Sequence, residues 1–340
     1  MWQLLVIFQK VSYQVFKENI NMVNKLRSAG YLVLALILVT SLVGCKSASI
    51  QKDQVTLQLN WYHSAEFIGY YTAFDKGFYR DANIDVSVKE GGTGVAAWKT
   101  ILDNRADFAI ATFDEQKANM ENSQPSVAVM TTFQIPPLVM FSLADSGIKE
   151  PKDIAGKRVG IKSSYWETVA RTTLTNAGID PSKMIEVQVP ADAQSMLYNK
   201  EVDVWMGYAH DEPIKAEEAG YKITDIFPGD YGVGGYEGLL TVTQGTINQK
   251  PDLVKRFVRA SQKGLQYAME HPEEAAQIMT KWQPSEKLDF YKLAIRAIIP
   301  LVDIPQAKIG TIDSAHWTQL MGGSYKVQAP GYTMLFLEGN

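Results

Sequence analysis

The sequence predicts an α/β fold, in which strands and helices alternate along the chain. Residues 55–59 and 84–88 alternate apolar and polar side chains with the period of a strand. Further apolar runs of strand length follow, and helical stretches separate many of them. Strands interleaved with helices are typical of largely parallel sheets. These further runs are 108–112, 127–133, 158–162, 185–189 and 202–207.

The C-terminal part is predicted to be helical. From Pro251 to Ala268, apolar residues recur at the i, i+3 and i+4 spacing of one helix face. Pro251 suits the first turn of this helix, and Pro272 opens another helix in the same way.

Two segments, residues 101–116 and 196–213, share one plan. Each has an apolar helix end, a polar turn, an aspartate (Asp107 or Asp203), a strand, an aromatic residue and an acidic pair. Either the chain contains two similar α/β lobes, or any two strand–helix units would look this similar. Because open α/β sheets bind ligands beyond the carboxyl ends of their strands, two similar lobes would place both aromatic–acidic pairs at one cleft.

The first 44 residues are predicted to be a signal peptide. Their apolar run, residues 31–41, is about half as long as the roughly 20 residues of a membrane-spanning helix, and Lys25 and Arg27 precede it. Residues 1–21 fit this layout poorly, which suggests that translation starts at Met22. The run LVGC resembles the lipobox of bacterial lipoproteins, and this resemblance implies cleavage before Cys45 and a lipid on its sulfur. The alternative is a free buried cysteine.

Composition excludes several classes of function. With 340 residues, of which 46% are hydrophobic, the chain can build more than one compact domain, and its net charge of -4 gives no basic surface for nucleic acid. The single cysteine cannot form an internal disulfide, and the four histidines have no metal-ligand spacing. After a polar tether, residues 45–52, no segment is predicted to cross a membrane.

Four stretches carry a resemblance to a known family: LQLNWYHSAEFIGYYTAFDKGFY (57–79), EGGTG (90–94), DVWMGYAHDEP (203–213), and the segments 230–240 and 251–275. They resemble the periplasmic binding proteins that group thiamine-pyrimidine-precursor binders with sulfonate, taurine, nitrate and riboflavin binders. The resemblance implies a type II fold, with two α/β lobes joined by two crossover strands that close on ligand like a hinge. Lobe I is expected to take residues 53–142 and 229–335, and lobe II residues 143–228.

The resemblance also implies partners and a location. The chain is expected to be an exported monomer, anchored to the membrane by a lipid on Cys45, that delivers its ligand to an ABC permease and ATPase and needs no cofactor. The same superfamily includes a fungal pyrimidine synthase that consumes its own histidine and uses a cysteine-rich iron motif. In this chain Phe67 takes the position of that histidine, and Cys45 is the only cysteine. A binding protein is therefore favoured over an enzyme, and a sensor that signals to a membrane kinase stays open.

The candidate ligand site is aromatic and acidic. Aromatic faces can stack on a flat heterocycle, and carboxylates accept hydrogen bonds from an exocyclic amine or a ring N–H. A thiamine-precursor aminopyrimidine is therefore the favoured ligand, and riboflavin is the second candidate. The residues assigned to this site are Asn60, Trp61, Phe67, Asp114, Trp166, Glu167, Tyr208, Glu212, Tyr236 and Glu237.

The glycine-rich turn EGGTG, which includes Thr93, offers a different kind of site. It precedes an apolar helix, and its backbone N–H groups can hold an anion such as a sulfonate, nitrate or phosphate. An anion site usually adds arginine or lysine, and the motifs above contain few basic residues. Small anions such as taurine and nitrate are therefore the third candidate.

Overall fold

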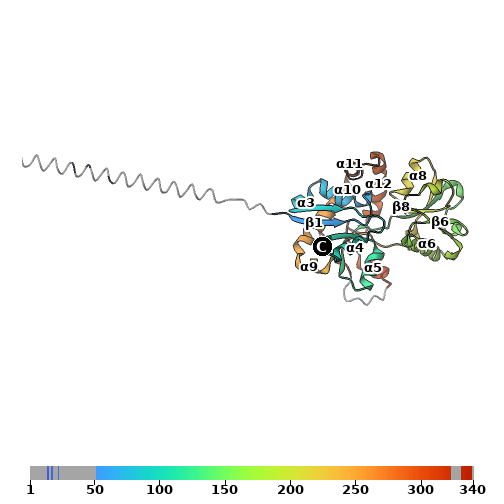
Figure 1. Cartoon of the computed structure of the whole chain (residues 1–340), viewed down its shortest axis with the longest axis horizontal. Coiled ribbons are helices and arrows are strands. Elements are labelled where there is room, and N and C mark those ends of the chain that lie inside the picture. Colours follow the sequence, from blue (N-terminus) through green and yellow to red (C-terminus); the bar gives the residue numbers. More distant parts are fainter. Residues whose placement is uncertain (1–13, 15–16, 18–21, 23–50, 323–330, 339–340) are drawn as a thin grey trace, which may run out of the picture. The chain divides into compact units, whose positions relative to one another are not determined.

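The computed structural model describes residues 51–322 and 331–338, together with the isolated residues 14, 17 and 22. The chain divides into two compact units, Met1–Gln51 and Lys52–Asn340, and the strands and helices named below belong to the second (Figure 1). The predicted signal-peptide run and Cys45 lie outside the described residues. Within the described ranges, no helix is both long enough and apolar enough to span a membrane.

A five-stranded sheet has the strand order β2-β1-β3-β10-β4. Strand β1 is parallel to β2 and β3, and Val55 lies opposite Val86. Strand β10 runs antiparallel between β3 and β4, where Leu240 lies opposite both Ile110 and Met130. The strands are β1 (Asp53–Gln58), β2 (Ile84–Lys89), β3 (Phe108–Ala111), β4 (Ser126–Phe133) and β10 (Glu237–Thr243).

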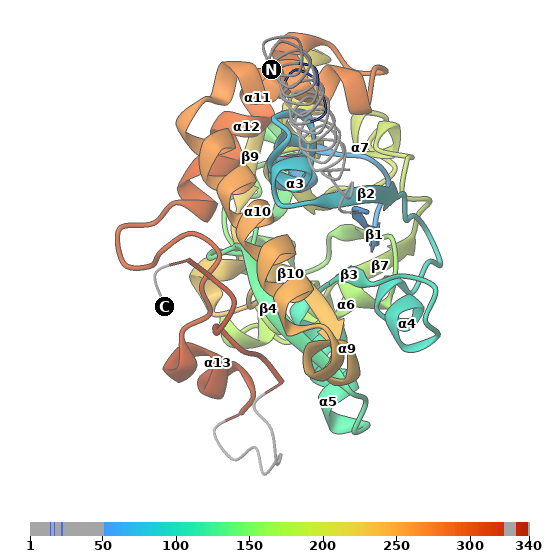
Figure 2. The same cartoon turned by 90° about the vertical axis from the view of Figure 1, so that its left-hand side faces the viewer.

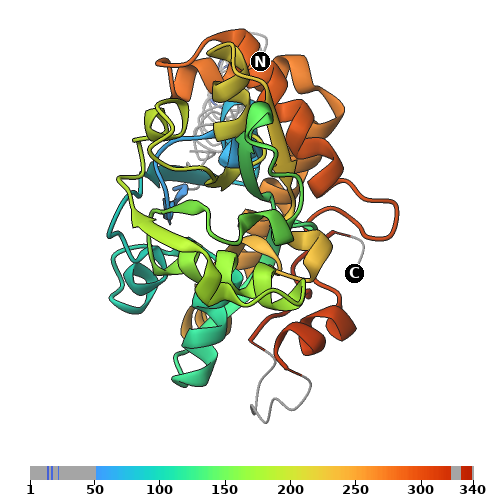
Figure 3. The ribbon, with the colours of Figure 1, turned by 90° about the vertical axis from the view of Figure 1, so that its right-hand side faces the viewer.

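The segment between β4 and β10 forms a second group of strands, drawn in green and yellow in Figure 3. Strand β5 lies between β8 and β9 and is antiparallel to both, and β6 pairs in parallel with β7. An isolated bridge from Val159 to Val204 joins the two sets, so the order β7-β6-β8-β5-β9 matches that of the first sheet. The strands are β5 (Leu138–Leu143), β6 (Arg158–Ile161), β7 (Ile185–Gln188), β8 (Trp205–Tyr208) and β9 (Ile223–Ile226).

The segments 101–116 and 196–213, which share one plan in the sequence, also make equivalent hydrogen bonds in the structure. The Asp107 carboxylate accepts the backbone N–H of Thr56 at 2.8 Å, and the N–H of Asp107 donates to the carbonyl of Thr56 at 3.0 Å. Asp203 makes the same two bonds with Arg158, both at 2.8 Å. Each aspartate thus holds the start of the third strand of its sheet, β3 or β8, against the second strand, β1 or β6.

The prediction of largely parallel sheets is confirmed for all strands except one in each sheet. Strands β10 and β5 are antiparallel to both of their neighbours, because the chain enters each sheet on one of these strands after leaving the other sheet. It leaves the first sheet between Phe133 and Leu138 and returns between Ile226 and Glu237. Strand β5, which the sequence-based boundary assigned to lobe I, pairs with the second group of strands.

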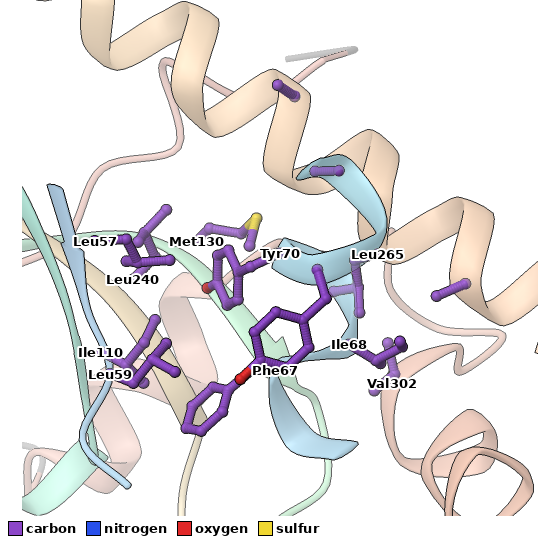
Figure 4. Packing of buried hydrophobic residues seen from close by; sticks show 14 of the residues in the cluster. Leu57, Leu59, Phe67, Ile68, Tyr70, Ile110, Met130, Leu240, Leu265 and Val302 are labelled. Carbon is purple, nitrogen blue, oxygen red and sulfur yellow. The ribbon is translucent and has the colours of Figure 1, made fainter. Parts of the chain in front are cut away.

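Helices pack against the first sheet and enclose its core, part of which is shown in Figure 4. Helix α10 (Pro251–Glu270) contacts β4, which it crosses in the view of Figure 2, and packs closely on α2 (Ile68–Asp75). The two predicted C-terminal helices are confirmed as α10 and α11. The other helices are α3 (Phe78–Asp81), α4 (Ala97–Leu102), α5 (Phe113–Glu121), α6 (Ser164–Asn176), α7 (Ser195–Tyr198), α8 (Glu212–Glu218), α9 (Gln244–Gln249), α11 (Pro272–Trp282), α12 (Leu288–Val302) and α13 (Ser314–Leu320), with 3-10 helices at η1 (Ala65–Phe67), η2 (Ala144–Ser146), η3 (Pro151–Ile154), η4 (Pro181–Lys183) and η5 (Pro228–Tyr231).

C-terminal segments cover the outer edge of β4. The N–H of Ala128 donates to the carbonyl of Gly331 at 2.9 Å, and that of Thr131 donates to Gly310 at 3.0 Å. Gln116, on α5, adds a side-chain bond of 2.8 Å to the carbonyl of Gly331. These bonds satisfy backbone groups that would otherwise be free to pair with another chain.

Candidate functional site

A narrow cavity lies where strand ends from both groups of strands meet. Open α/β sheets bind their ligands at this position, beyond the carboxyl ends of strands. The space holds about one water molecule, so an aromatic ligand can enter only if the walls move apart. Its walls are formed by Asn60, Glu66, Phe67, Ile110, Phe133, Pro137, Tyr208, Glu237 and Gly238.

Two buried carboxyl groups line this cavity. Glu66, in η1, is 9% exposed, and Glu237, the first residue of β10, is 5% exposed. Burial raises the pKa of each from its usual 4.5 to about 8, and the charge of Glu66 contributes to the rise of the pKa of Glu237. Both groups are therefore mainly protonated at neutral pH, and the cavity carries little of the charge that two carboxylates would give it.

Hydrogen-bond acceptors in the cavity wall lack partners within the protein. Oε1 of Glu66 and Oδ1 of Asn60 are buried, and neither accepts a hydrogen bond from the described residues. Leaving such a group unsatisfied costs about 1–3 kcal/mol, which a ligand with N–H donors would recover. The other carboxyl, Glu237, accepts the hydroxyl of Tyr165 from α6 at 2.7 Å.

Aromatic rings form one side of the site. His210 stacks between Tyr208, at a centroid distance of 5.6 Å, and Phe133, at 5.7 Å. Burial lowers the pKa of His210 to about 4, so its imidazole is neutral, and its Nδ1 has no partner among the described residues. Trp166 lies 5.5 Å from Tyr208 and extends the aromatic surface.

A buried ion pair supports the strand end at Tyr208. Nζ of Lys162 lies 2.5 Å from Oε1 of Glu212, and the other carboxylate oxygen accepts the N–H of Tyr208 at 2.8 Å. The Lys162 ammonium also lies over the ring of Trp166, 4.5 Å from its centroid. The sequence motifs did not reveal this lysine, and in the structure its charge is neutralised by Glu212.

The structure brings four of the predicted site residues into the cavity wall: Asn60, Phe67, Tyr208 and Glu237. Trp61 follows Asn60 directly, is 39% exposed and packs edge-on against Tyr62. Trp166 lies behind the wall, in contact with Tyr208 and with Tyr165.

The other predicted site residues lie outside the cavity wall. Glu167 makes an ion pair of 2.9 Å with Arg171, and Glu212 is occupied by Lys162. The hydroxyl of Tyr236 accepts the N–H of Asp313 at 2.8 Å within a separate apolar cluster. Thr93 and Asp114 are exposed, although the charge of Asp114 still raises the pKa of Glu237.

Sequence reasoning missed five of the wall residues, namely Glu66, Ile110, Phe133, Pro137 and Gly238. Glu66 had a detectable signal, because it stands alone among apolar residues between Ala65 and Phe67. A carboxyl in an apolar run either faces solvent or is buried, and burial is costly unless the carboxyl has a partner. The remaining four residues have no polar side chain that would mark them.

The buried carboxyls predict how stability depends on pH. Between about pH 4.5 and about pH 8, Glu66 and Glu237 hold protons in the folded protein that the unfolded chain has released. The free energy of unfolding should therefore fall as the pH rises through this window. A Glu66→Gln variant, which remains neutral, should show a flatter decline between pH 6.5 and pH 8 in urea denaturation.

The control for this measurement is Glu121→Gln, which changes an exposed glutamate at the end of α5. This variant should keep the slope of the parent protein. An unchanged slope in Glu66→Gln would mean that Glu66 is already ionised in the folded protein.

The positions associated with catalysis in the fungal synthase have other roles in this structure. Phe67 is buried in the core, and the nearby His63 lies 2.8 Å from the hydroxyl of Tyr71 through its Nδ1. No group of three or more metal-ligating side chains occurs within the described ranges.

Residues 64–275, more than half of the chain, match the protein family described as NMT1/THI5 like. The chain belongs to this family. The match confirms the resemblance that the sequence motifs indicated, and it includes every strand named above except β1 and every residue of the cavity wall except Asn60.

Relatives in the NMT1/THI5-like family carry the names of both enzymes and binding proteins. A 4-amino-5-hydroxymethyl-2-methylpyrimidine phosphate synthase of Legionella pneumophila is 26% identical over 73% of this chain and 80% of its own length. The riboflavin-binding protein RibY of Chloroflexus aurantiacus is 25% identical over 69% of this chain and 68% of its own. A formylaminopyrimidine-binding protein of Halalkalibacterium halodurans is 20% identical over 85% and 91%, respectively.

Solved structures confirm the fold class. The periplasmic aliphatic sulphonate binding protein SsuA of Escherichia coli aligns with a TM-score of 0.63 at 14% identity, over 80% of this chain and 85% of that protein. The α/β fold of this NMT1/THI5-like chain is therefore that of periplasmic binding proteins.

Proposed function

We propose that this chain is the extracytoplasmic substrate-binding lipoprotein of an ABC importer, and that it captures a small aromatic heterocycle. The observation that carries the proposal is the cavity at the strand ends, where aromatic rings surround two carboxyls and an unpaired amide oxygen. This wall can stack on a flat ring and accept hydrogen bonds from its amine groups.

An aminopyrimidine related to thiamine precursors is the favoured ligand. The names of the Legionella and Halalkalibacterium relatives both refer to aminopyrimidines, which supports this choice. Riboflavin is the second candidate, because of the relative RibY. Sulfonates and nitrate fit poorly, since an anion would face the unpaired acceptor Oδ1 of Asn60, and none of the wall residues is basic.

We also propose that ligand binding closes two lobes, one containing residues 53–142 and 229–335 and the other residues 143–228. Strands of the first sheet and of the second group both contribute to the cavity, so a hinge at the two crossovers would open and close it. The closed monomer would then dock on the permease, which an ATPase drives.

A pyrimidine synthase is the competing function, and the name of the Legionella relative favours it. The phenyl ring of Phe67 and the hydrogen-bonded position of His63 argue against a synthase that consumes a histidine. Mass spectrometry of the purified chain after incubation with iron would decide between the two. A new pyrimidine product or a modified histidine would establish an enzyme.

The ligand class can be tested by calorimetry with 4-amino-5-hydroxymethyl-2-methylpyrimidine, riboflavin, taurine and nitrate. We expect the aminopyrimidine to bind most tightly, and small-angle scattering of the saturated protein to show a smaller radius. Trp61→Ala should lower this affinity roughly tenfold, because it removes a stacking surface beside Asn60. Phe74→Ala, which removes a ring that is 44% exposed on α2, is the control. Tight binding of taurine or nitrate alone would refute the proposal.

The lipid anchor can be tested independently of the ligand. In cells, Cys45→Ala should leave an unprocessed precursor that incorporates no labelled fatty acid, because the sulfur that would carry the lipid is gone. Normal labelling of this variant would exclude Cys45 as the attachment site.

A further inference from the structure

We infer that the cavity binds its ligand as a cation, held between the carboxyl groups of Glu66 and Glu237. This inference rests on the proposed function, because it concerns the same cavity, and it narrows the ligand to a class. That class is a protonated amidine-type group, such as the ring nitrogen and adjacent amine of an aminopyrimidinium ion.

The hydrogen-bonding capacity of the wall points to a ligand that donates. Glu66 is 9% exposed, it lines the cavity, and its Oε1 has no partner among the described residues. Oδ1 of Asn60, in the same wall, is also an unpaired acceptor. Glu237 accepts from Tyr165 through Oε1 only. An amidinium group presents N–H donors in one plane, and carboxylates bind such groups with charge-assisted bonds.

The charged side chains near the two carboxyls are mostly those of acidic residues. Lys162 is bound to Glu212 at 2.5 Å, and Lys215 is bound to Asp211 at 2.7 Å, so neither of these lysines is free to neutralise the pair. A cationic ligand would therefore supply the missing positive charge. The titratable and charged groups facing the pair are Asp211 and Glu212 from the N-terminal end of α8, Asp114 and Glu115 from α5, Tyr71 from α2, Tyr165 from α6 and Tyr208 from the end of β8, behind which His210 stacks.

Cation binding has a defined proton balance. Because burial keeps both carboxyls protonated at neutral pH, a permanent cation must displace one proton, whose O–H bond breaks and which passes to the buffer. The electron pair stays on the carboxylate, and the charge of the cavity is unchanged. A neutral aminopyrimidine would instead take this proton onto its ring nitrogen, and no proton would be released.

Acetamidinium and acetamide form a matched pair of probes, since they have the same shape and differ in charge. We expect calorimetry of the full chain at pH 7 to show that acetamidinium binds at least roughly tenfold more tightly than acetamide. Repeating the titration in two buffers with different ionisation heats should give about one released proton per bound acetamidinium. Equal affinity for the two probes, or binding of acetamidinium without proton release, would overturn the inference.

Variants locate the effect. Glu66→Gln and Glu237→Gln should each lower the acetamidinium affinity about tenfold or more, while Glu121→Gln, at the exposed end of α5, should leave it unchanged. If a cavity variant fails to fold, the proton count of the parent protein still decides. Acetamidinium binding without any aminopyrimidine binding would refute the proposed ligand alone. Aminopyrimidine binding that is independent of both glutamates would refute the cation inference alone.

Discussion

Glu212→Gln is expected to lower the free energy of unfolding by about 3–5 kcal/mol. The carboxylate of Glu212 accepts the Lys162 ammonium at 2.5 Å and the N–H of Tyr208 at 2.8 Å. The side chains of the two ion-pair partners are only 8% and 15% exposed. An amide retains the shape but leaves the lysine charge buried without its counterion. Urea denaturation at pH 7 measures the loss.

The double variant Lys162→Met/Glu212→Gln is the control for this prediction. It removes both charges together, so it should be more stable than Glu212→Gln and should show a coupling energy of at least about 1 kcal/mol in the mutant cycle. Strictly additive losses would mean that the two residues act separately. The sequence predicted that Glu212 accepts a hydrogen bond from the ligand. Because Lys162 and the N–H of Tyr208 already bind its two oxygens, the main effect of Glu212 should be on stability.

Gly264→Ala is expected to cost at least about 2 kcal/mol of stability, although alanine is the better helix former. Gly264 lies where α10 crosses α2 with their backbones in contact. An added Cβ would overlap the carbonyl oxygen of Gly69 and would lie 2.6 Å from Cβ of Ala73. The two helices would have to separate, and the core beneath them would be disturbed. Thermal unfolding followed by circular dichroism would measure the effect.

Gly245→Ala provides the matched comparison on α9. A Cβ at this exposed position would find its nearest neighbour, Oγ1 of Thr243, at 3.6 Å, which is an ordinary contact. This variant should therefore be as stable as the parent or slightly more stable. If the two variants were equally stable, the close approach of α2 and α10 would have no energetic role.

The elements that were predicted correctly have either one buried face or, in β3 and β4, a continuous apolar run of strand length. Strands β1 and β2 alternate because one side meets the helices, and α10 shows its apolar face at helical spacing. Strand β5 was missed, although Leu138 to Leu143 is buried as completely as the predicted strand β4. The antiparallel direction of β5 and β10 depends on partners far away in the chain, so local patterns cannot reveal it.

The cavity was only partly predictable for a related reason. Asn60 and Tyr208 could be found because they follow strands, and such positions meet at one edge of a sheet. Glu66 interrupts an apolar run in the sequence, but only the packing of the turn after β1 shows that its carboxyl is buried. Likewise, the pairing of Lys162 with Glu212 joins residues that come together only when β6 and β8 lie side by side.

The central position of β10 affects the order in which the chain can fold. Strands β3 and β4 are complete by residue 133, but they have no contact in the sheet until residues 237–243 insert between them. During synthesis from the N-terminus, more than a hundred residues must follow β4 before β10 is available to complete the first sheet. Such non-local pairing makes folding slow compared with local helix formation. This delay makes the half-built sheet dependent on protection from aggregation until β10 arrives.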